Sequence, residues 1–294
     1  QGCYGMSHFT ALVNSADENV RHVLGLSGGK DSAALAIFIK DQYPKIHEKV
    51  EYFFSDTGAE LPEAYEFLDK LETYLGKPIV RLGTGREFDH WLTVHNDMLP
   101  SARARWCSRT MKIKPFEKFV GDDSVISYVG IRADENREGY ISSKDTIKAV
   151  FPFIDDGLVR DDIFRMLEDT VGIPEYYKWR SRSGCYFCFF QRQDEWLGLK
   201  ENHPKLFDKA KQYELRQRER YDLDVADKRL MGNGNYTWSQ GGTIEEIAAK
   251  ALKRREEKGI IASSNDLSST RWQDILKQQD DDDPEDQACL ICSL

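Results

Sequence analysis

Apolar and polar positions along the first 150 residues predict strands that alternate with helices. The predicted strands are short, apolar and rich in β-branched or aromatic residues, and they cover residues 20–26, 50–54, 79–82, 125–131 and 147–151, the last as an edge strand. Segments 33–40 and 61–75 between them have helical character. Such alternation is typical of a parallel sheet with helices on both faces. We therefore expect a doubly wound, mostly parallel α/β fold of the Rossmann-like class.

The pattern changes after Pro152, where helices follow one another without strands. Helices are predicted over residues 161–171, 191–200, 204–221 and 243–258, with glycine-rich residues 231–243 as a flexible loop. Thr243 and Glu246 have the spacing of a capping box at the start of the last helix, and Gly259 is its expected stop. We interpret residues 1–5 as a remnant of a cleaved tag, 6–160 as the α/β domain, 161–258 as a helical part and 259–294 as a flexible acidic tail.

Composition and charge narrow the possible functions. The 294 residues include 41 Lys and Arg against 50 Asp and Glu, which gives a net charge of −9. An acidic chain binds polyanions poorly, so a role with nucleic acid requires a local basic patch. We find no apolar segment near the roughly 20 residues that a membrane-spanning helix needs, and expect no membrane partner. A homodimer is compatible with the sequence.

Cysteine usage indicates a reducing compartment. Apart from Cys3, the chain has five cysteines, four of them in two Cys-x-x-Cys pairs. An odd number without a secretory signal argues against a disulfide framework and suits a metal or sulfur role in the cytoplasm. We therefore expect a cytoplasmic protein.

A glycine-containing loop, Ser-Gly-Gly-Lys-Asp-Ser, joins the first strand to the first helix at residues 27–32. Its two glycines allow a tight turn, and the N–H groups that open the helix point toward an anion. Lys30 adds a cation, and Ser27 and Ser32 add hydroxyls. The spacing is not that of a Walker A loop. The loop is expected to bind phosphate groups, the alternative being a plain turn with Asp31 as cap.

This loop resembles the signature of the PP-loop ATP pyrophosphatases, which have an adenine nucleotide α-hydrolase-like fold. Within them, the chain is similar to the phosphoadenosine phosphosulfate reductase-like branch, because Asp56-Thr57-Gly58, residues 130–135 and the cysteine pattern also match. Over residues 20–200 it is most similar to the ATP pyrophosphatases of DNA phosphorothioation, the SspD and DndC proteins.

The resemblance implies that ATP and Mg²⁺ are bound at the carboxyl edge of the sheet. The implied nucleotide-binding residues are Ser27, Gly28, Gly29, Lys30, Asp31, Ser32, Asp56, Thr57, Gly130 and Arg132, and the implied catalytic ones are Lys30, Asp31, Ser32 and Arg132. From the residues alone, Asp56 is equally well placed to cap the following helix. Arg132 is expected to pair with a phosphate, with Asp134 or Glu135 near Mg²⁺, the alternative being a salt bridge within the loop.

Three cysteines are candidate metal ligands. Cys185 and Cys188 form a Cys-x-x-Cys knuckle, and Cys107 lies in a basic stretch that favours thiolate character. In relatives, such a triplet holds a [4Fe–4S] cluster, which Tyr186, Phe187, Phe189 and Phe190 are expected to shield; structural zinc is the alternative. The fourth ligand stays open among Cys289, Cys292 and an exogenous sulfide. His203 is a weak candidate, more typical of a helix cap, and the tail cysteines are equally compatible with incidental thiols.

The segment from Arg103 to Lys118 is the densest positive stretch, with six Lys or Arg and one Glu. We expect it to bind nucleic acid or phosphate through Arg103, Arg105, Arg109, Lys112 and Lys114. Lys178, Arg180 and Arg182, with segments 205–220 and 250–258, are further candidates for a nucleic-acid groove. The alternative for these segments is solvated helix faces with paired charges.

The favoured function is an ATP pyrophosphatase that adenylates the DNA backbone phosphate for sulfur incorporation. Its expected partners are DNA, a cysteine desulfurase as sulfur donor and other sulfur-modification proteins, with the iron–sulfur cluster relaying sulfur. Three alternatives stay open: a phosphoadenosine or adenosine phosphosulfate reductase, a tRNA thiolation enzyme and a non-catalytic iron–sulfur nucleotide sensor. The Glu-Cys-Gly-Leu-His setting of reductase cysteines is missing from this sequence, which weighs against a simple reductase.

Overall fold

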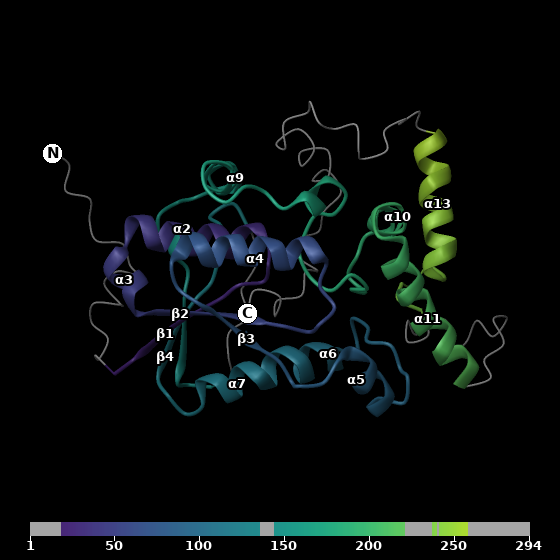
Figure 1. Ribbon diagram of the computed structural model, residues 1–294, viewed down its shortest axis with the longest axis horizontal. Coiled ribbons are helices and arrows are strands. Elements are labelled where there is room, and N and C mark those ends of the chain that lie inside the picture. Colours follow the sequence, from purple (N-terminus) through teal and green to yellow (C-terminus); the bar gives the residue numbers. More distant parts are fainter. Residues whose placement is uncertain (1–18, 136–143, 221–236, 240, 258–294) are drawn as a thin grey trace.

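A five-stranded parallel sheet forms the centre of the structure, a computed structural model that describes residues 19–135, 144–220, 237–239 and 241–257 (Figure 1). The strand order is β3-β2-β1-β4-β5 and all four pairings are parallel. The strands are β1 (Arg21–Gly25), β2 (Val50–Ser55), β3 (Ile79–Leu82), β4 (Val125–Tyr128) and β5 (Ile147–Val150). The predicted parallel α/β fold is confirmed, and β5 lies at an edge as expected.

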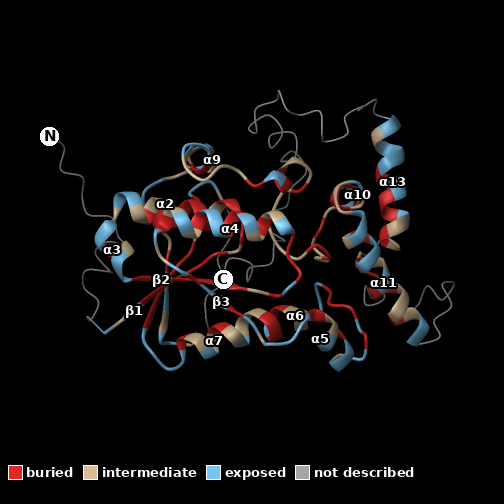
Figure 2. Cartoon of the chain, in the orientation of Figure 1, coloured by how far each residue is buried: buried red, intermediate tan, exposed pale blue. Residues whose placement is uncertain are grey.

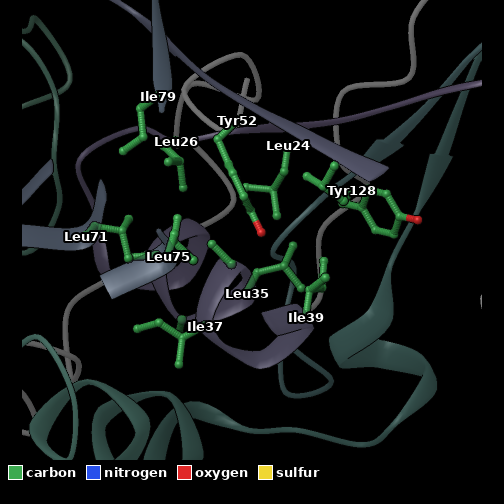
Figure 3. Close-up of a cluster of buried hydrophobic side chains, with 14 of the residues drawn as sticks. Leu24, Leu26, Leu35, Ile37, Ile39, Tyr52, Leu71, Leu75, Ile79 and Tyr128 are labelled. Atoms are coloured by element: carbon green, nitrogen blue, oxygen red, sulfur yellow. The ribbon is translucent and has the colours of Figure 1, made fainter. Parts of the chain in front are cut away.

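Helices cover both faces of this sheet because its strands are apolar on both sides. Leu24 of β1 lies opposite Tyr52 of β2 and Tyr128 of β4, and all three join one buried cluster (Figure 3). Helices α2 (Lys30–Gln42), α4 (Pro62–Leu75) and α9 (Arg160–Glu168) complete that cluster. The neighbouring residues Val23 and Phe53 point to the opposite face, where they pack with α7 (Lys114–Val120).

The helical part packs around a second core rich in aromatic residues. It contains α10 (Gln193–Asn202), α11 (Pro204–Arg220) and α13 (Ile244–Glu257), which lie together beyond one end of the sheet in Figure 1. Helix α5 (Phe88–Val94), from the first half of the chain, contributes Phe88 and Leu92 to the same core. Conversely, α9 follows Pro152, where the predicted helical part begins, but it packs against the sheet through the first buried cluster.

The predicted capping box is present at the start of α13. The Glu246 amide donates to Thr243 Oγ1 at 3.2 Å, and the Thr243 amide donates to the Glu246 carboxylate at 3.1 Å. Residues 1–18, 231–236 and 258–294 lie outside the described residues, so the structure does not describe the tag remnant, most of the glycine-rich loop, Gly259 or the tail cysteines.

Several short elements were not predicted from the sequence pattern. They are α3 (Pro44–Lys49), α5, α6 (Trp106–Ser108), the π-helical turn η1 (Arg109–Ile113), α7, α8 (Pro152–Asp155) and the 3₁₀ turn η2 (Glu175–Lys178). Helix α2 begins at Lys30 rather than 33, so half of the phosphate loop is helical, and β4 ends at Tyr128 rather than 131. Figure 2 shows buried residues along the strands and the inward helix faces. In the described part of the chain, no helix is long and apolar enough to span a bilayer.

Candidate active site

The carboxyl ends of β1, β2 and β4 bring the predicted nucleotide-binding segments together. The loop of residues 27–32 follows β1, Asp56 and Thr57 follow β2, and residues 130–132 follow β4. In an open parallel sheet, ligands bind outside the carboxyl ends of the strands. The neighbouring order β2-β1-β4 therefore places these segments at one edge.

The loop after β1 is held by its own serines. The Ser27 amide donates to Ser32 Oγ at 3.1 Å, and the Gly29 amide donates to Ser27 Oγ at 3.3 Å. Gly28 has a φ of 73°, a left-handed conformation that favours glycine. A Cβ on Gly29 would lie 2.6 Å from Ser183 Oγ, so a larger residue would require Ser183 to shift. The path of the backbone thus favours glycine at position 28, and the contact with Ser183 favours glycine at position 29.

Lys30 is almost completely buried, with 6% of its surface exposed, and its Nζ lies 3.0 Å from Asp31 Oδ2. Burial disfavours the charged ammonium, but the charge of Asp31 and the proximity of Tyr177 outweigh it and raise the pKa of Lys30. Burial also opposes ionisation of Asp31, yet Lys30 and Arg132 hold the pKa of its carboxyl well below the usual range. The pair is therefore ionised at neutral pH.

Arg132 links the loop to the end of β4. It is 3% exposed, and its guanidinium contacts Asp31, Asp134 and Glu135, each at 2.9 Å. The salt bridge that the sequence left as the alternative is thus present, and phosphate binding by Arg132 stays a prediction. Gly130 allows the close approach, because a Cβ there would lie 3.0 Å from the Asp31 carbonyl oxygen.

The Asp-Thr-Gly motif after β2 joins the loop region to the cysteine knuckle. Asp56 Oδ1 accepts hydrogen bonds from the Gly58 amide and the Tyr65 hydroxyl, both at 2.8 Å. Asp56 does not cap α4, whose N-cap residue forms no side-chain cap bond. The Thr57 hydroxyl donates to the buried Glu60 carboxylate at 2.9 Å and lies 3.2 Å from Cys185 Sγ.

Residues 176–185, which we name the strap, cover the loop and were not predicted to do so. The Tyr176 hydroxyl donates to the Gly28 carbonyl at 2.6 Å, and the Tyr177 hydroxyl accepts from the Lys30 amide at 2.9 Å. Ser183 Oγ lies 3.2 Å from Ser27 Oγ. These contacts join residues between 147 and 156 positions apart, and no local pattern in the sequence indicates them.

Arg180 corrects one prediction. It was a candidate for a nucleic-acid groove, but it is fully buried at 0% exposure. Its guanidinium donates to the carbonyls of Gly184 at 3.0 Å and Cys185 at 2.8 Å. The Cys185 carbonyl also accepts from the Cys188 amide at 3.0 Å, so Arg180 adds a buried donor to the tight turn of the knuckle.

Cys107 and Cys185 border one aromatic cluster, and all three candidate cysteines are half-buried. Phe88 lies between Trp106, the neighbour of Cys107, and Phe187 of the knuckle, at centroid distances of 5.4 and 4.2 Å. The knuckle therefore lies on the same side of the molecule as Cys107.

The thiols nevertheless do not form a ready metal site. Over the described residues, no group of three His, Cys, Asp or Glu side chains is arranged to hold one ion. Burial, with the nearby charge of Glu60, raises the pKa of the Cys185 thiol well above its usual value, and Lys112 only partly opposes this. Cys289 and Cys292, the candidate fourth ligands, lie outside the described residues.

The basic stretch borders the knuckle. Arg103, Arg109 and Lys114 are exposed, and the Arg105 guanidinium lies 5.0 Å from the centre of the Phe190 ring. Arg182 lies over the same ring at 5.3 Å. Of the basic residues predicted to meet a phosphate-rich substrate, Arg105 therefore lies beside the knuckle, and the charge of Lys112 acts on Cys185.

The later basic segments are largely neutralised by acidic partners on other elements. Lys211 pairs with Glu245, and Arg216 and Arg220 pair with Asp97. Arg254 and Arg255 pair with Asp194 and Glu201. This arrangement agrees with the solvated-face alternative, although most pairs join different helices. His203 is the C-cap residue of α10 and its Nε2 lies 2.8 Å from Glu63, as expected for a cap rather than a ligand.

The part of the chain that forms the sheet matches a known protein family. Residues 21–154 match the profile of the family described as the phosphoadenosine phosphosulfate reductase domain. Among curated proteins, the chain is similar to two uncharacterized proteins of Methanocaldococcus jannaschii. It is 29% identical to MJ0066, in an alignment that covers 64% of this chain and 40% of MJ0066. It is 26% identical to MJ0973, in an alignment that covers 79% of this chain and 55% of MJ0973. The chain thus spans about half the length of these relatives.

Two further similarities are more distant. The uncharacterized nin region protein ORF290 of Escherichia phage lambda is 24% identical over 60% of this chain and 68% of that protein. A crystal structure of phosphoadenylyl-sulfate reductase from Candida auris, a phosphate complex, is 14% identical with a TM-score of 0.47, covering 60% of this chain and 85% of that one.

Proposed function

We propose, for a chain whose residues 21–154 form a phosphoadenosine phosphosulfate reductase-like domain, that the sheet edge binds ATP and releases pyrophosphate as an acceptor is adenylated. The observation that carries this proposal is the loop at residues 27–32. It opens α2 with backbone N–H groups and places Lys30 and Arg132 around the same carboxylate. Amides at a helix N-terminus with cations beside them are suited to a pyrophosphate.

The chemistry that these residues support is stabilisation of a leaving group. An acceptor oxygen attacks the α-phosphorus of ATP, and the bond to the bridging oxygen breaks, so that pyrophosphate departs with the bonding electrons. The loop amides and the Lys30 ammonium stabilise the charge that develops there. Asp31 keeps Lys30 protonated, so Lys30 acts as a cation rather than as a base.

Magnesium fits the polar groups at this edge. Mg²⁺ is usually held by one or two carboxylates and the substrate phosphates, and when bound it neutralises phosphate charge. Asp31 and Asp134 are partly exposed carboxylates on either side of Arg132. Either side chain is a candidate oxygen ligand of the nucleotide-bound metal.

For the acceptor, we propose the DNA backbone phosphate, with sulfur supplied by a cysteine desulfurase and other sulfur-modification proteins. What supports DNA is the position of the basic stretch next to the cysteine knuckle. What supports sulfur chemistry is the pair Cys185 and Cys188, two residues beyond a serine that contacts the phosphate loop. An ATP site and a thiol site thus share one strap.

The test is formation of AMP and pyrophosphate by anaerobic protein with ATP and Mg²⁺, measured with duplex DNA, with tRNA and without nucleic acid. Lys30→Ala and Ser32→Ala are each expected to lower the rate by about 10²–10³, the usual loss for one such donor. Lys45→Ala removes an exposed lysine on α3 and serves as the matched control.

Three results would contradict parts of the proposal. Equal rates in the Lys30 and Ser32 variants and in the wild type would refute the loop assignment. Stimulation by tRNA but not by DNA would indicate the tRNA thiolation enzyme, and sulfite release from an adenylyl sulfate would indicate the reductase. ATP binding without turnover under all conditions would indicate the sensor.

A further inference from the structure

The strap contacts the amide that a phosphate would be expected to use. Lys30 is the first residue of α2, so its N–H has no acceptor within the helix. The Tyr177 hydroxyl accepts from this N–H at 2.9 Å, and its ring lies 5.8 Å from Lys30 Nζ. The phenol oxygen of Tyr177 therefore accepts a hydrogen bond from this amide, as a phosphate oxygen would.

The loop is enclosed in this arrangement. Gly28, Gly29 and Lys30 are buried, as are Tyr176 and Tyr177. Ser183 closes the other side, since its Oγ leaves no space beside Gly29. A pyrophosphate group therefore has to displace part of the strap before it reaches the Lys30 amide.

We propose that the Tyr177 hydroxyl holds the place of a phosphate oxygen, so that pyrophosphate binding displaces the strap and carries the cysteine knuckle with it. The inference rests on the proposed pyrophosphate site. A charged oxygen forms a stronger hydrogen bond with an amide than a neutral phenol does, which gives the ligand the advantage in this exchange.

The strap has the connections to transmit such a displacement. Tyr177 and Cys185 are eight positions apart in the chain. The buried Arg180 between them donates to the carbonyls of Gly184 and Cys185, so the segment moves as a packed unit. Occupancy of the loop thereby changes the environment of Cys185, which otherwise lies against Thr57 and Glu60.

Two neighbouring tyrosines provide a matched pair of variants. Tyr177→Phe removes an acceptor and frees an amide donor, which an anion can use. Tyr176→Phe removes a hydroxyl that donates to the Gly28 carbonyl, and a freed carbonyl has no attraction for an anion. Both changes delete one buried hydroxyl from the same turn, so a general loss of packing affects them alike.

The first measurement is the affinity of the full chain for inorganic pyrophosphate by calorimetry. We expect Tyr177→Phe to bind pyrophosphate about tenfold more tightly than the wild type, because the phenol no longer competes with the ligand for one hydrogen bond. We expect Tyr176→Phe to bind pyrophosphate no more tightly than the wild type. Equal or weaker binding by Tyr177→Phe would overturn the proposal, as would equal tightening in both variants. If neither the wild type nor Tyr177→Phe binds pyrophosphate or ATP, the proposed function itself fails.

The second measurement is amide hydrogen exchange of the wild type with and without pyrophosphate. Peptides covering residues 176–185 are expected to exchange faster when pyrophosphate is bound, while peptides from α7 keep their rate. Unchanged or slower exchange of the strap in protein saturated with pyrophosphate would show that the ligand binds without displacing it, and would overturn the coupling while leaving the pyrophosphate site intact.

Discussion

Glu214 is a buried carboxyl group whose hydrogen bonds join three segments of the helical part. It lies on α11 at 2% exposure and accepts from the amides of Trp238 at 3.0 Å and Ile244 at 3.2 Å. Burial raises the pKa of Glu214 to about 7; the two amides and Arg218 oppose the rise, and Glu246 adds to it. Near neutral pH this residue therefore carries its proton in a substantial fraction of folded molecules.

The raised pKa predicts that Glu214 stabilises the fold less as pH rises. The pKa of the Glu214 carboxyl is about 7 in the folded state and ordinary in the unfolded state. Its contribution to stability is therefore complete at pH values below the unfolded pKa and is lost as the pH rises through the folded pKa. We expect the free energy of unfolding to fall by about 2–3 kcal/mol between pH 5 and 8 through this group alone. Urea unfolding at both pH values measures it.

Glu214→Gln supplies the control, because an amide has no charge to gain over this range. Relative to the variant, the wild type is expected to have a higher free energy of unfolding at pH 5 than at pH 8. A difference that stays constant between pH 5 and 8 would show that Glu214 keeps an ordinary pKa in the folded state.

At the scale of elements, the sequence predicted the helices, strands and loops that are encoded by residues close together in the chain. The strand at β1, the loop at residues 27–32 and the capping box of Thr243 and Glu246 each depend on neighbours within a few positions, and each is found where expected. The stretch from α6 to α7 was not predicted as helical, because its charges hide the apolar spacing of Met111 and Phe116.

The candidate site was predictable only in part for the same reason. The sequence indicated the loop, the residues after β2 and β4, and the cysteines, because each is a compact motif. It could not indicate that Tyr177 meets Lys30 or that Arg180 is buried, since these contacts depend on how the strap folds back over the sheet edge. Long-range partners leave no periodic trace in a single sequence.

The knuckle and the turn that carries Cys107 come from different elements, and a metal centre would have to join them. We expect anaerobically purified protein to be brown with about four irons per chain, and Cys107→Ser, Cys185→Ser and Cys188→Ser each to bleach it. Iron analysis and visible absorbance are the measurements. Colourless protein with one tightly held zinc would favour the structural-metal alternative, and colourless protein without metal would rule out both.

At the scale of the whole molecule, this acidic chain has a cationic region, the stretch from Arg103 to Lys118, of which Arg105 lies beside the cysteine knuckle. The net charge of −9 disfavours non-specific binding of polyanions by the chain. The basic segments on α11 and α13 are largely paired with carboxylates, whereas Arg103, Arg109 and Lys114 are exposed. Attraction of DNA to this protein should therefore depend on few residues.

This concentration of charge predicts a steep and local salt dependence. If Arg105 and Arg109 each contact a phosphate, Arg105→Ala/Arg109→Ala should weaken DNA binding and reduce the slope of log K against log salt by about 1.8, because each phosphate contact contributes about 0.9. Fluorescence anisotropy of a labelled duplex over a series of salt concentrations measures both quantities.

The matched control removes the same charge elsewhere, through Lys45→Ala/Lys49→Ala on α3, where both lysines are exposed. The two double variants have the same net charge, so any effect of net charge alone on DNA binding is the same in both. Only direct contacts at the basic stretch distinguish them, so a slope that changes alike in both variants would refute the stretch as the DNA contact. If Arg105→Ala/Arg109→Ala instead raises the ATP concentration needed for half-maximal binding and leaves DNA affinity unchanged, these arginines serve the nucleotide, and the acceptor must approach the knuckle from another side.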